Sequence, residues 1–245
     1  MNAGSLRLRY NAAGAGDNRE SAGGGILVLM FRDRSDAGRA LAGLLSGYRG
    51  RGETVLLALP RGGVPVAGVM ARELGLPLDV LGVHKVGAPG QPEYAIGAVA
   101  AGGLVVWNEE AIAAMHLGQA ELDAAVERER EELARRERLY REGRAPFALA
   151  GWTVVLVDDG LATGYTMLAA VRAVRQAQAA RVVVAVPVAP AETIAVLRGE
   201  ADEVVCALTP DRLFAVGQFY EDFSQVTDEE VRGWMGGTPP GGIWE

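Results

Sequence analysis

The chain has 245 residues, of which 49% are hydrophobic, and a formal net charge of −7. This length allows one well-buried domain or two small ones. The acidic balance argues against a general nucleic-acid binder, because such proteins gain affinity by neutralising phosphates with lysine and arginine. No uncharged apolar run of about 18 or more residues is present, so we expect no membrane-spanning helix.

The two ends of the chain differ in composition from its middle. Residues 1–24 are rich in glycine, alanine, asparagine and arginine, and we expect a disordered extension rather than a secretory signal. Residues 25–232 are expected to form the folded domain and residues 233–245 a flexible tail. The single cysteine, Cys206, lies in an apolar run and is expected to be a buried strand residue, in a protein of the reducing cytoplasm.

Strand and helix patterns alternate along the chain. The expected helices are 36–48, 64–74, 167–178 and 191–198, and the expected strands are 54–59, 78–83, 153–157, 181–188 and 203–208. This alternation predicts βαβ units and an α/β fold with a mostly parallel central sheet flanked by helices.

A long helical insertion is expected over residues 109–144. Its first half carries apolar residues, and its second half is densely charged. Three pairs at i,i+4 spacing are Glu131–Arg135, Glu132–Arg136 and Glu137–Arg141. The segment is either a solvated helix that packs on the domain through a narrow face or a contact in a dimer.

The segment from Val154 to Thr166 carries the strongest functional signal. Its first four residues lack polar alternation and predict a strand buried on both faces. Asp158 and Asp159 then follow at the carboxyl end of this strand, where open α/β sheets bind ligands. The run Thr163-Gly164-Tyr165-Thr166 begins the next helix, where N–H groups and the helix dipole favour a phosphate.

Two carboxylates repel phosphate, so they are expected to bind another part of the same ligand. Vicinal sugar hydroxyls are suitable, because an ionised carboxylate is a strong hydrogen-bond acceptor. The ligand implied is therefore a sugar that carries a phosphate near its diol. The alternative is a buried strand that ends in an ordinary Asp-Asp-Gly turn.

The 154–166 segment resembles the phosphoribosyl-pyrophosphate (PRPP) binding motif of type I phosphoribosyltransferases. In that family, hydrophobic residues precede two acidic residues and a short loop that ends Thr-Gly-x-Thr/Ser. The resemblance implies that Asp158 and Asp159 hold the ribose hydroxyls and that residues 163–166 anchor the 5′-phosphate. Gly160 and Ala162 are expected to complete this part of the PRPP site.

A second motif lies nearly a hundred residues upstream, at Leu57 to Pro65. It predicts a strand, a glycine-containing turn and a helix with proline near its first turn. Gly62 and Gly63 would let a ligand approach the backbone, and the Arg61 fork can hold phosphate oxygens bidentately. The stretch resembles the pyrophosphate-binding loop of the same family, although alone it is equally consistent with a plain turn.

The third stretch, Val83 to Gly90, is similar to the start of the mobile loop in adenine-type phosphoribosyltransferases. Lys85 could neutralise a diphosphate, with a solvated loop lysine as the alternative. His84 replaces the family's arginine and would be only partly charged near neutral pH, and the spacing to proline is one residue shorter. We expect residues 84–94 to form a lid-like loop that excludes water from the site.

Candidate acceptor-binding residues lie in two places. Glu93, in the expected lid, is a possible proton acceptor for a nitrogen nucleophile, or else a solvated carboxylate. The family covers its acceptor base with a hood, which Phe219, Tyr220 and Asp222 could supply in the aromatic C-terminal segment of this chain. The alternative for these aromatic residues is the hydrophobic core.

The resemblance covers about residues 27–232 and is to the uncharacterised branch of the family. It implies transfer of the 5-phosphoribosyl group of PRPP to a nitrogen acceptor, expected to be a nucleobase, with release of pyrophosphate. The catalytic residues would be Asp158, Asp159, Arg61 and Lys85. Mg²⁺ would bind through substrate oxygens and water rather than a dedicated protein cage. The family also implies a homodimer.

Two other functions remain open from the sequence. One is a regulatory protein that binds PRPP or a nucleotide without catalysis, which a catalytic loop weakened at His84 would favour. The other is a generic doubly wound nucleotide-binding domain, which is disfavoured because neither G-x-G-x-x-G nor G-x-x-x-x-G-K-[ST] is present.

Overall fold

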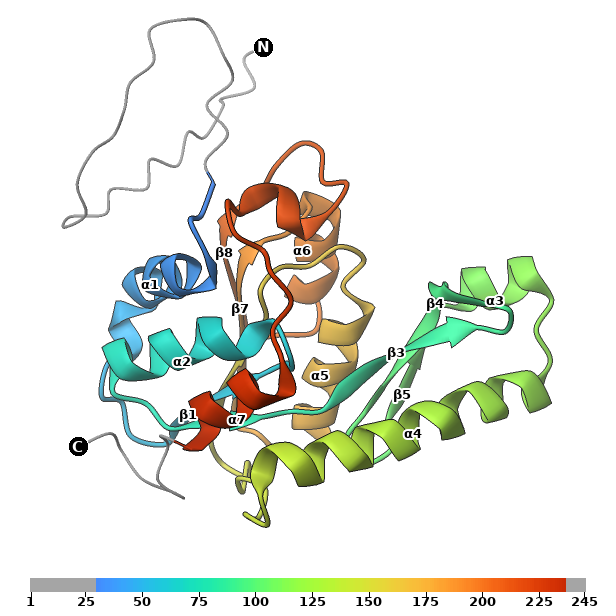
Figure 1. Ribbon diagram of the computed structural model, residues 1–245, viewed down its shortest axis with the longest axis horizontal. Coiled ribbons are helices and arrows are strands. Elements are labelled where there is room, and N and C mark those ends of the chain that lie inside the picture. Colours follow the sequence, from blue (N-terminus) through green and yellow to red (C-terminus); the bar gives the residue numbers. More distant parts are fainter. Residues whose placement is uncertain (1–29, 237–245) are drawn as a thin grey trace, which may run out of the picture.

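A parallel sheet forms the centre of the structure, a computed structural model that describes residues 30–236 except for the side chains of residues 92 and 93. The strand order is β2-β1-β6-β7-β8 (Figure 1). The strands are β1 (Thr54–Ala58), β2 (Leu78–Val80), β6 (Thr153–Val157), β7 (Arg181–Val188) and β8 (Glu203–Leu208). The expected extension at residues 1–24 lies outside the described residues.

Helices cover both faces of this sheet, which explains why its central strands are apolar throughout. One face carries α1 (Arg34–Leu44), α2 (Gly63–Leu74) and α7 (Asp228–Gly236), and the other carries α5 (Tyr165–Gln176) and α6 (Ala191–Arg198). Successive strand residues alternate between the two cores, as Val154 and Val155 do. The expected α/β fold with a parallel central sheet is confirmed.

A smaller antiparallel sheet stands beside the central one and corrects the loop expected at 84–94. It contains β3 (Val83–Ala88), β4 (Gln91–Ala100) and β5 (Val105–Trp107). Residues 89 and 90 make only the turn of a hairpin between β3 and β4. The strands form because alternate residues are buried on opposite faces, Val83 in the core with α5 and Val86 in the core with α4. This packing outweighs the glycine and proline content.

The helical insertion is two helices rather than one: α3 (Glu109–Met115) and α4 (Gln119–Arg141). The break falls at His116, whose backbone is left-handed with a φ of 51°. α4 lies along the outside of the small sheet, as Figure 1 shows, and buries a narrow face that includes Leu122 and Tyr140. It packs on its own domain, and a contact of α4 with a second copy stays a prediction.

Two of the three expected ion pairs on α4 form. The side chains of Glu132 and Arg136 approach to 2.6 Å, and those of Glu137 and Arg141 to 3.7 Å. Arg135 pairs with Glu132 at 2.7 Å rather than with Glu131. One carboxylate therefore bridges two guanidinium groups, because i,i+3 and i,i+4 neighbours both lie on one side of a helix.

The first four residues of the expected tail, 233–236, belong to a helix. α7 begins after a reciprocal cap in which Thr227 and Glu230 bond to each other's backbone N–H groups. It continues to Gly236 and buries Met235, so residues 233–236 belong to the domain. Cys206 lies on β8 as expected, but it is only partly buried because β8 is an edge strand.

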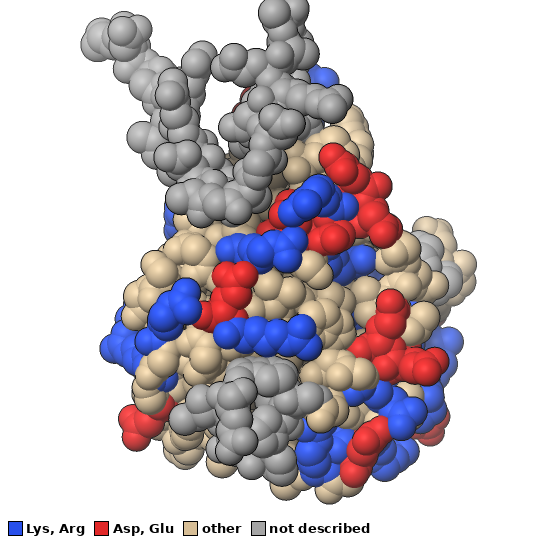
Figure 2. Space-filling model, turned by 60° about the vertical axis from the view of Figure 1, so that its left-hand side comes forward, with Lys and Arg blue, Asp and Glu red and all other residues tan. Residues whose placement is uncertain are grey.

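Charges of both signs are interspersed over the face shown in Figure 2. On α1, for example, Asp36 pairs with Arg32 at 3.1 Å and with Arg39 at 3.6 Å.

Among residues 30–236, no helix is both long and apolar enough to cross a membrane.

Candidate active site

Two loops far apart in sequence meet at one edge of the central sheet. β1 and β6 are parallel neighbours paired in register, so the loops after Ala58 and Val157 leave the sheet side by side. The contact is too close for side chains. A Cβ added to Gly63 would lie 2.5 Å from the Val157 carbonyl oxygen, and one added to Gly62 would lie 2.0 Å from Asp159 Oδ2. The two glycines therefore allow the Pro-Arg-Gly-Gly loop to touch the carboxylates.

The carboxylates themselves are held by several hydrogen bonds. The Asp159 backbone N–H donates to Asp158 Oδ1 at 2.8 Å, and Arg34 Nε donates to Asp159 Oδ2 at 2.8 Å. The Tyr220 hydroxyl donates to the backbone carbonyl of Asp159 at 2.6 Å. Asp158 Oδ2 and Asp159 Oδ1 take no part in these bonds. These two oxygens remain available to accept hydrogen bonds from a diol.

Burial and charge act differently on the two acids. Burial raises the pKa of Asp158 well above its usual range, and the negative charge of Asp159 raises it further. Burial also raises the pKa of Asp159, but the Arg34 guanidinium opposes this effect. Arg34 therefore offsets part of the effect of burial on Asp159, whose pKa is still raised overall.

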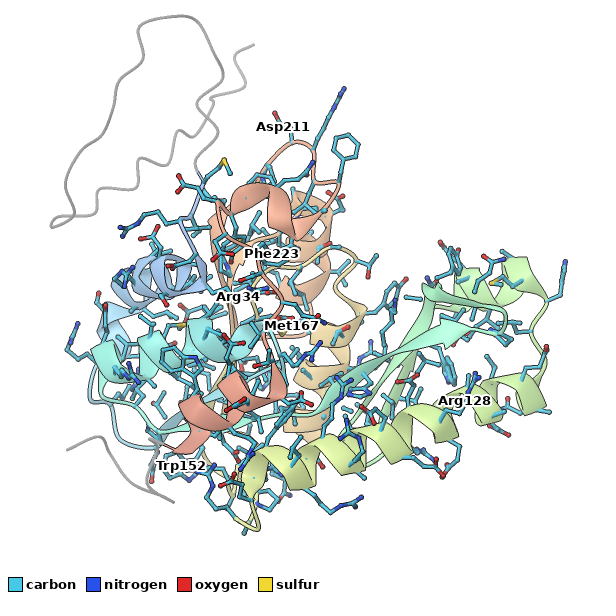
Figure 3. All side chains as sticks on the ribbon, in the orientation of Figure 1. Arg34, Arg128, Trp152, Met167, Asp211 and Phe223 are labelled. Atoms are coloured by element: carbon cyan, nitrogen blue, oxygen red, sulfur yellow. The ribbon has the colours of Figure 1, made fainter. Side chains whose placement is uncertain are left out.

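Arg34 is a site residue that the sequence did not indicate. It lies at the start of α1, 125 residues from Asp159, and no motif surrounds it. Its Nη1 also donates to the Ser224 carbonyl oxygen at 2.7 Å, and its guanidinium carbon lies 4.0 Å from the centre of the Phe223 ring. Figure 3 shows Arg34 beside Phe223, in agreement with this contact.

The expected phosphate loop is supported by neighbouring elements. The Leu161 N–H donates to the Val188 carbonyl at 2.9 Å, and the Thr193 hydroxyl donates to the Ala162 carbonyl at 2.9 Å. Gly164 has a left-handed φ of 79° and begins α5, whose first N–H groups have no partner within the helix. Thr193, on α6, is a second residue that the sequence did not single out.

A cavity of about 90 Å³ lies beside this loop, between α5 and α6. It is lined by Thr163, Gly164, Tyr165, Leu168, Thr193, Val196 and Leu197. Three of the four residues expected to anchor the 5′-phosphate are in this lining, while Thr166 lies one position further along α5. A larger, mostly apolar cavity of about 390 Å³ lies elsewhere, along the β8 edge, and contains none of the expected site residues.

Arg61 is turned towards α7. Its Nη1 lies 3.7 Å from Asp228 Oδ1, and the Tyr140 hydroxyl donates to the same oxygen at 2.6 Å. Arg61 remains 28% exposed, so a ligand at the loop can reach it. Burial and the hydrogen bond to Asp228 raise the pKa of Tyr140, which keeps this hydroxyl neutral.

His84 and Lys85 are neighbours on β3 and differ in their surroundings. The His84 ring is 3.2 Å from a carboxylate oxygen of Glu129 on α4. Burial and the charge of Arg136 lower the pKa of His84, so the neutral imidazole is favoured and the positive charge of the family's arginine is not reproduced. Lys85 lies on the exposed side of the strand.

Of the candidate acceptor-binding residues, Phe219 and Tyr220 lie in the hydrophobic core. Phe219 packs with Phe31 in a buried cluster, and the Tyr220 ring is buried while its hydroxyl holds Asp159. Neither ring is free to stack on a base. Asp222 is exposed and accepts a hydrogen bond from the Ser224 N–H at 2.9 Å. The side chain of Glu93 lies outside what the structure describes.

Phe223, in the C-terminal segment, is an exposed ring that contacts the Arg34 guanidinium. It is 36% exposed, and its ring centre lies 4.9 Å from that of Tyr220. A cluster of aromatic residues in a sequence does not reveal which ring is core and which is accessible.

The donor set suits a magnesium ion carried by a diphosphate ligand. Within residues 30–236, no group of three or more His, Cys, Asp or Glu side chains is arranged to hold a metal ion. Mg²⁺ commonly uses one or two carboxylates together with substrate oxygens and waters. Asp158 and Asp159 are expected to bind the ribose hydroxyls, so oxygens of the substrate and of water would supply the coordination.

Comparison with known proteins gives the family of this chain. The model of the phosphoribosyl transferase domain matches residues 32–223. Two Mycobacterium tuberculosis proteins, "Putative phosphoribosyl transferase MT0597" and "Putative phosphoribosyl transferase Rv0571c", are each 48% identical to it over 204 residues. The match covers 83% of this chain and 46% of each relative, so the chain spans about half the length of these relatives.

A solved structure covers the same region. The crystal structure of TT1426 from Thermus thermophilus is 47% identical in sequence and matches with a TM-score of 0.71, over 84% of this chain and 97% of that chain. Together with the family match, this places the protein in one family and one fold. The chain belongs to the phosphoribosyltransferase family.

Proposed function

We propose that the protein transfers the 5-phosphoribosyl group of PRPP to a nitrogen acceptor and releases pyrophosphate. The observation that carries this proposal is the contact between the Pro-Arg-Gly-Gly loop and the Asp158–Asp159 turn. PRPP needs a diol acceptor and a diphosphate binder a few ångströms apart, and this contact brings both together.

The ribose is held by the carboxylates. Asp158 Oδ2 and Asp159 Oδ1 accept hydrogen bonds from the two ring hydroxyls, while the N–H groups at the start of α5 anchor the 5′-phosphate. Fixing both ends of the ribose phosphate aligns its anomeric carbon for in-line attack. Positive charge develops on the sugar in the transition state, and the nearby carboxylates stabilise it.

The leaving diphosphate lies on the side of the Pro-Arg-Gly-Gly loop. Arg61 turns from its 3.7 Å contact with Asp228 to the phosphate oxygens, where its fork binds two of them. Lys85 adds a second positive charge from β3. Mg²⁺, when bound with the substrate, supplies further neutralisation of the diphosphate.

The acceptor is a nitrogen nucleophile, for which a nucleobase is the expected class. Its identity depends on a few hydrogen bonds from the residues that cover the site. Glu93 remains the candidate proton acceptor from the hairpin tip.

Pyrophosphate release tests the proposal. PRPP and Mg²⁺ are incubated with purine bases, pyrimidine bases, small amines or no acceptor. The wild type is compared with Asp159→Asn, Arg61→Ala and, as a matched control, Asp123→Asn on the exposed side of α4. We expect release with at least one acceptor, a loss in the first two variants, and no change in the control.

Each variant has a result that would contradict the role assigned to its residue. Unchanged activity in Asp159→Asn would remove the ribose-binding role of that carboxylate. Unchanged turnover in Arg61→Ala would reduce the Pro-Arg-Gly-Gly loop to a turn.

A second candidate is a regulatory protein that binds PRPP or a nucleotide without catalysis. The neutral, Glu129-paired His84 favours it, because the position lacks the charge expected in a catalytic loop. Binding of PRPP by calorimetry, combined with no pyrophosphate release from any acceptor, would support this candidate over the enzyme.

A further inference from the structure

We propose that Arg34 is a positioning residue of the PRPP site, which orients Asp159 towards the ribose and joins it to the C-terminal segment 220–224. This inference rests on the proposed function. Arg34 would act through Asp159 and not by touching the sugar.

The first argument is geometric. Asp159 Oδ2 is enclosed between the Gly62 backbone and the Arg34 guanidinium, with the Arg34 Nε at 2.8 Å. The two side chains are only 14% and 11% exposed, respectively. With Oδ2 occupied by the protein, Oδ1 is the oxygen left to bind a ligand. Arg34 therefore determines which oxygen of Asp159 is left to bind the ribose.

The second argument is that Arg34 and Tyr220 hold the same residue from two distant segments. Arg34 binds the Asp159 carboxylate, while the Tyr220 hydroxyl binds its backbone carbonyl. Arg34 also reaches the Ser224 carbonyl at 2.7 Å and stacks on Phe223. A displacement of segment 220–224 would therefore change the position of the Asp159 carboxylate.

The third argument concerns charge. The groups that face Asp159 are Arg34 from α1, Asp158 from its own turn and Tyr220 from the C-terminal segment. Asp158 cannot supply a positive charge, and the Tyr220 hydroxyl stays neutral because burial raises its pKa. Arg34 is the cation in this set and lowers the pKa of Asp159, which offsets part of the rise caused by burial.

Lysine and glutamine separate the two roles of Arg34. Glutamine can donate a hydrogen bond but carries no charge, while lysine keeps the charge but lacks the fork that reaches both Asp159 and Ser224. Arg39→Gln is the matched control, because Arg39 lies on the same helix and its side chain is 45% exposed.

The first measurement is PRPP affinity against pH by calorimetry, with Mg²⁺ present. We expect Arg34→Gln to weaken binding about tenfold or more at neutral pH, the effect of losing one charge-assisted hydrogen bond. The acid limb of its binding profile should also move to higher pH. Arg34→Lys should keep the acid limb near the wild-type position with a smaller loss of affinity, and Arg39→Gln should match the wild type.

The second measurement needs no ligand. Carboxyl ¹³C titration by NMR, with the Asp159 signal assigned from Asp159→Asn, should show a higher pKa for Asp159 in Arg34→Gln than in the wild type or Arg34→Lys. An unchanged pKa, or wild-type PRPP binding by Arg34→Gln, would overturn the role of Arg34. Failure of the wild type to bind PRPP would instead overturn the proposed function, and the titration would still judge Arg34.

Discussion

Asp158 is a carboxyl group in a place that disfavours its charge. It follows the last residue of β6, where burial and the neighbouring Asp159 raise its pKa. Keeping such a group ionised lowers the stability of the folded state. Residues of this kind concentrate at functional sites, where binding a ligand matters more than maximal stability.

We predict that Asp158→Asn stabilises the ligand-free protein at neutral pH. The unfolded carboxyl titrates near pH 4 and the folded one higher, so the wild type loses stability as pH rises from the first pKa through the second. The asparagine variant avoids that loss, which is on the order of 1 kcal/mol for each pKa unit. Thermal melts between about pH 3.5 and 8 measure the difference.

The pH dependence is the decisive part of this test. The stability gain should be absent at the acid end of the range and reach a plateau once the folded Asp158 is ionised. A gain that is constant over the whole range would mean that packing, and not the charge of Asp158, is responsible. PRPP affinity of the same variant should fall.

Sequence reasoning at this scale succeeded where the signal was contiguous. Asp158, Asp159 and Arg61 lie in short motifs next to apolar strands, so their placement at strand ends followed from local patterns. Arg34 and Thr193 could not be found in this way, because their partners Asp159 and Ala162 lie 125 and 31 residues away. Phe219 and Tyr220 stayed open between a base contact and the hydrophobic core, because composition does not distinguish a buried ring from an exposed one.

Among the elements, α2 and α7 meet at a glycine. A Cβ added to Gly68 would lie 2.3 Å from Cε3 of Trp234, so the indole lies directly on the α2 backbone. Trp234 is also covered by the Arg72 guanidinium, 4.6 Å from its ring centre. This contact positions α7, which carries the Asp228 partner of Arg61.

We predict that Gly68→Ala destabilises the protein by about 1–3 kcal/mol, the usual cost of overpacking. The matched control is Gly43→Ala on α1, where no atom lies within 4 Å of the added Cβ. Alanine should there stabilise the helix by up to about 1 kcal/mol. Urea unfolding of both variants gives the free energies. Equal effects would show that Trp234 yields without cost and that the α2–α7 contact is loose.

The hairpin β3–β4 marks the limit of local reasoning about elements. Gly87, Pro89 and Gly90 predict a loop. Pro89 and Gly90 do form the turn of a hairpin, but Gly87 lies on β3, and the rest of the expected loop is paired strand. The deciding factor is that α4 and α5 cover opposite faces of the small sheet. Such coverage comes from distant segments of the chain, so tertiary packing overrides the local glycine and proline signals for a loop.

At the scale of the whole molecule, the candidate site draws on segments that are far apart along the chain. The first helix, the β1 and β6 loops and the C-terminal segment all contribute contacts. A ligand that bridges these parts binds only the folded state, so it should raise the stability of the entire domain.

We predict that PRPP with Mg²⁺ raises the melting temperature more than ribose 5-phosphate does. At a ligand concentration of about one hundred times Kd, the added stability is roughly 2.7 kcal/mol. In Arg61→Ala the extra effect of PRPP should shrink, while the effect of ribose 5-phosphate should persist, because that ligand lacks the diphosphate. Differential scanning calorimetry measures both. An equal loss for the two ligands would place Arg61 outside the diphosphate region.

The contacts of Arg34 also have a consequence for the order in which the protein folds during synthesis. Its partners Asp159 and Ser224 are 125 and 190 residues further along the chain. During synthesis, the Pro-Arg-Gly-Gly and Asp-Asp loops can meet once β6 has left the ribosome, but the carboxylate is not yet tied to residues 220–224. A nascent chain would carry a complete central strand pair and an unfinished site. Ligand affinity therefore arises last, as a sign that the C-terminal segment has closed over the site.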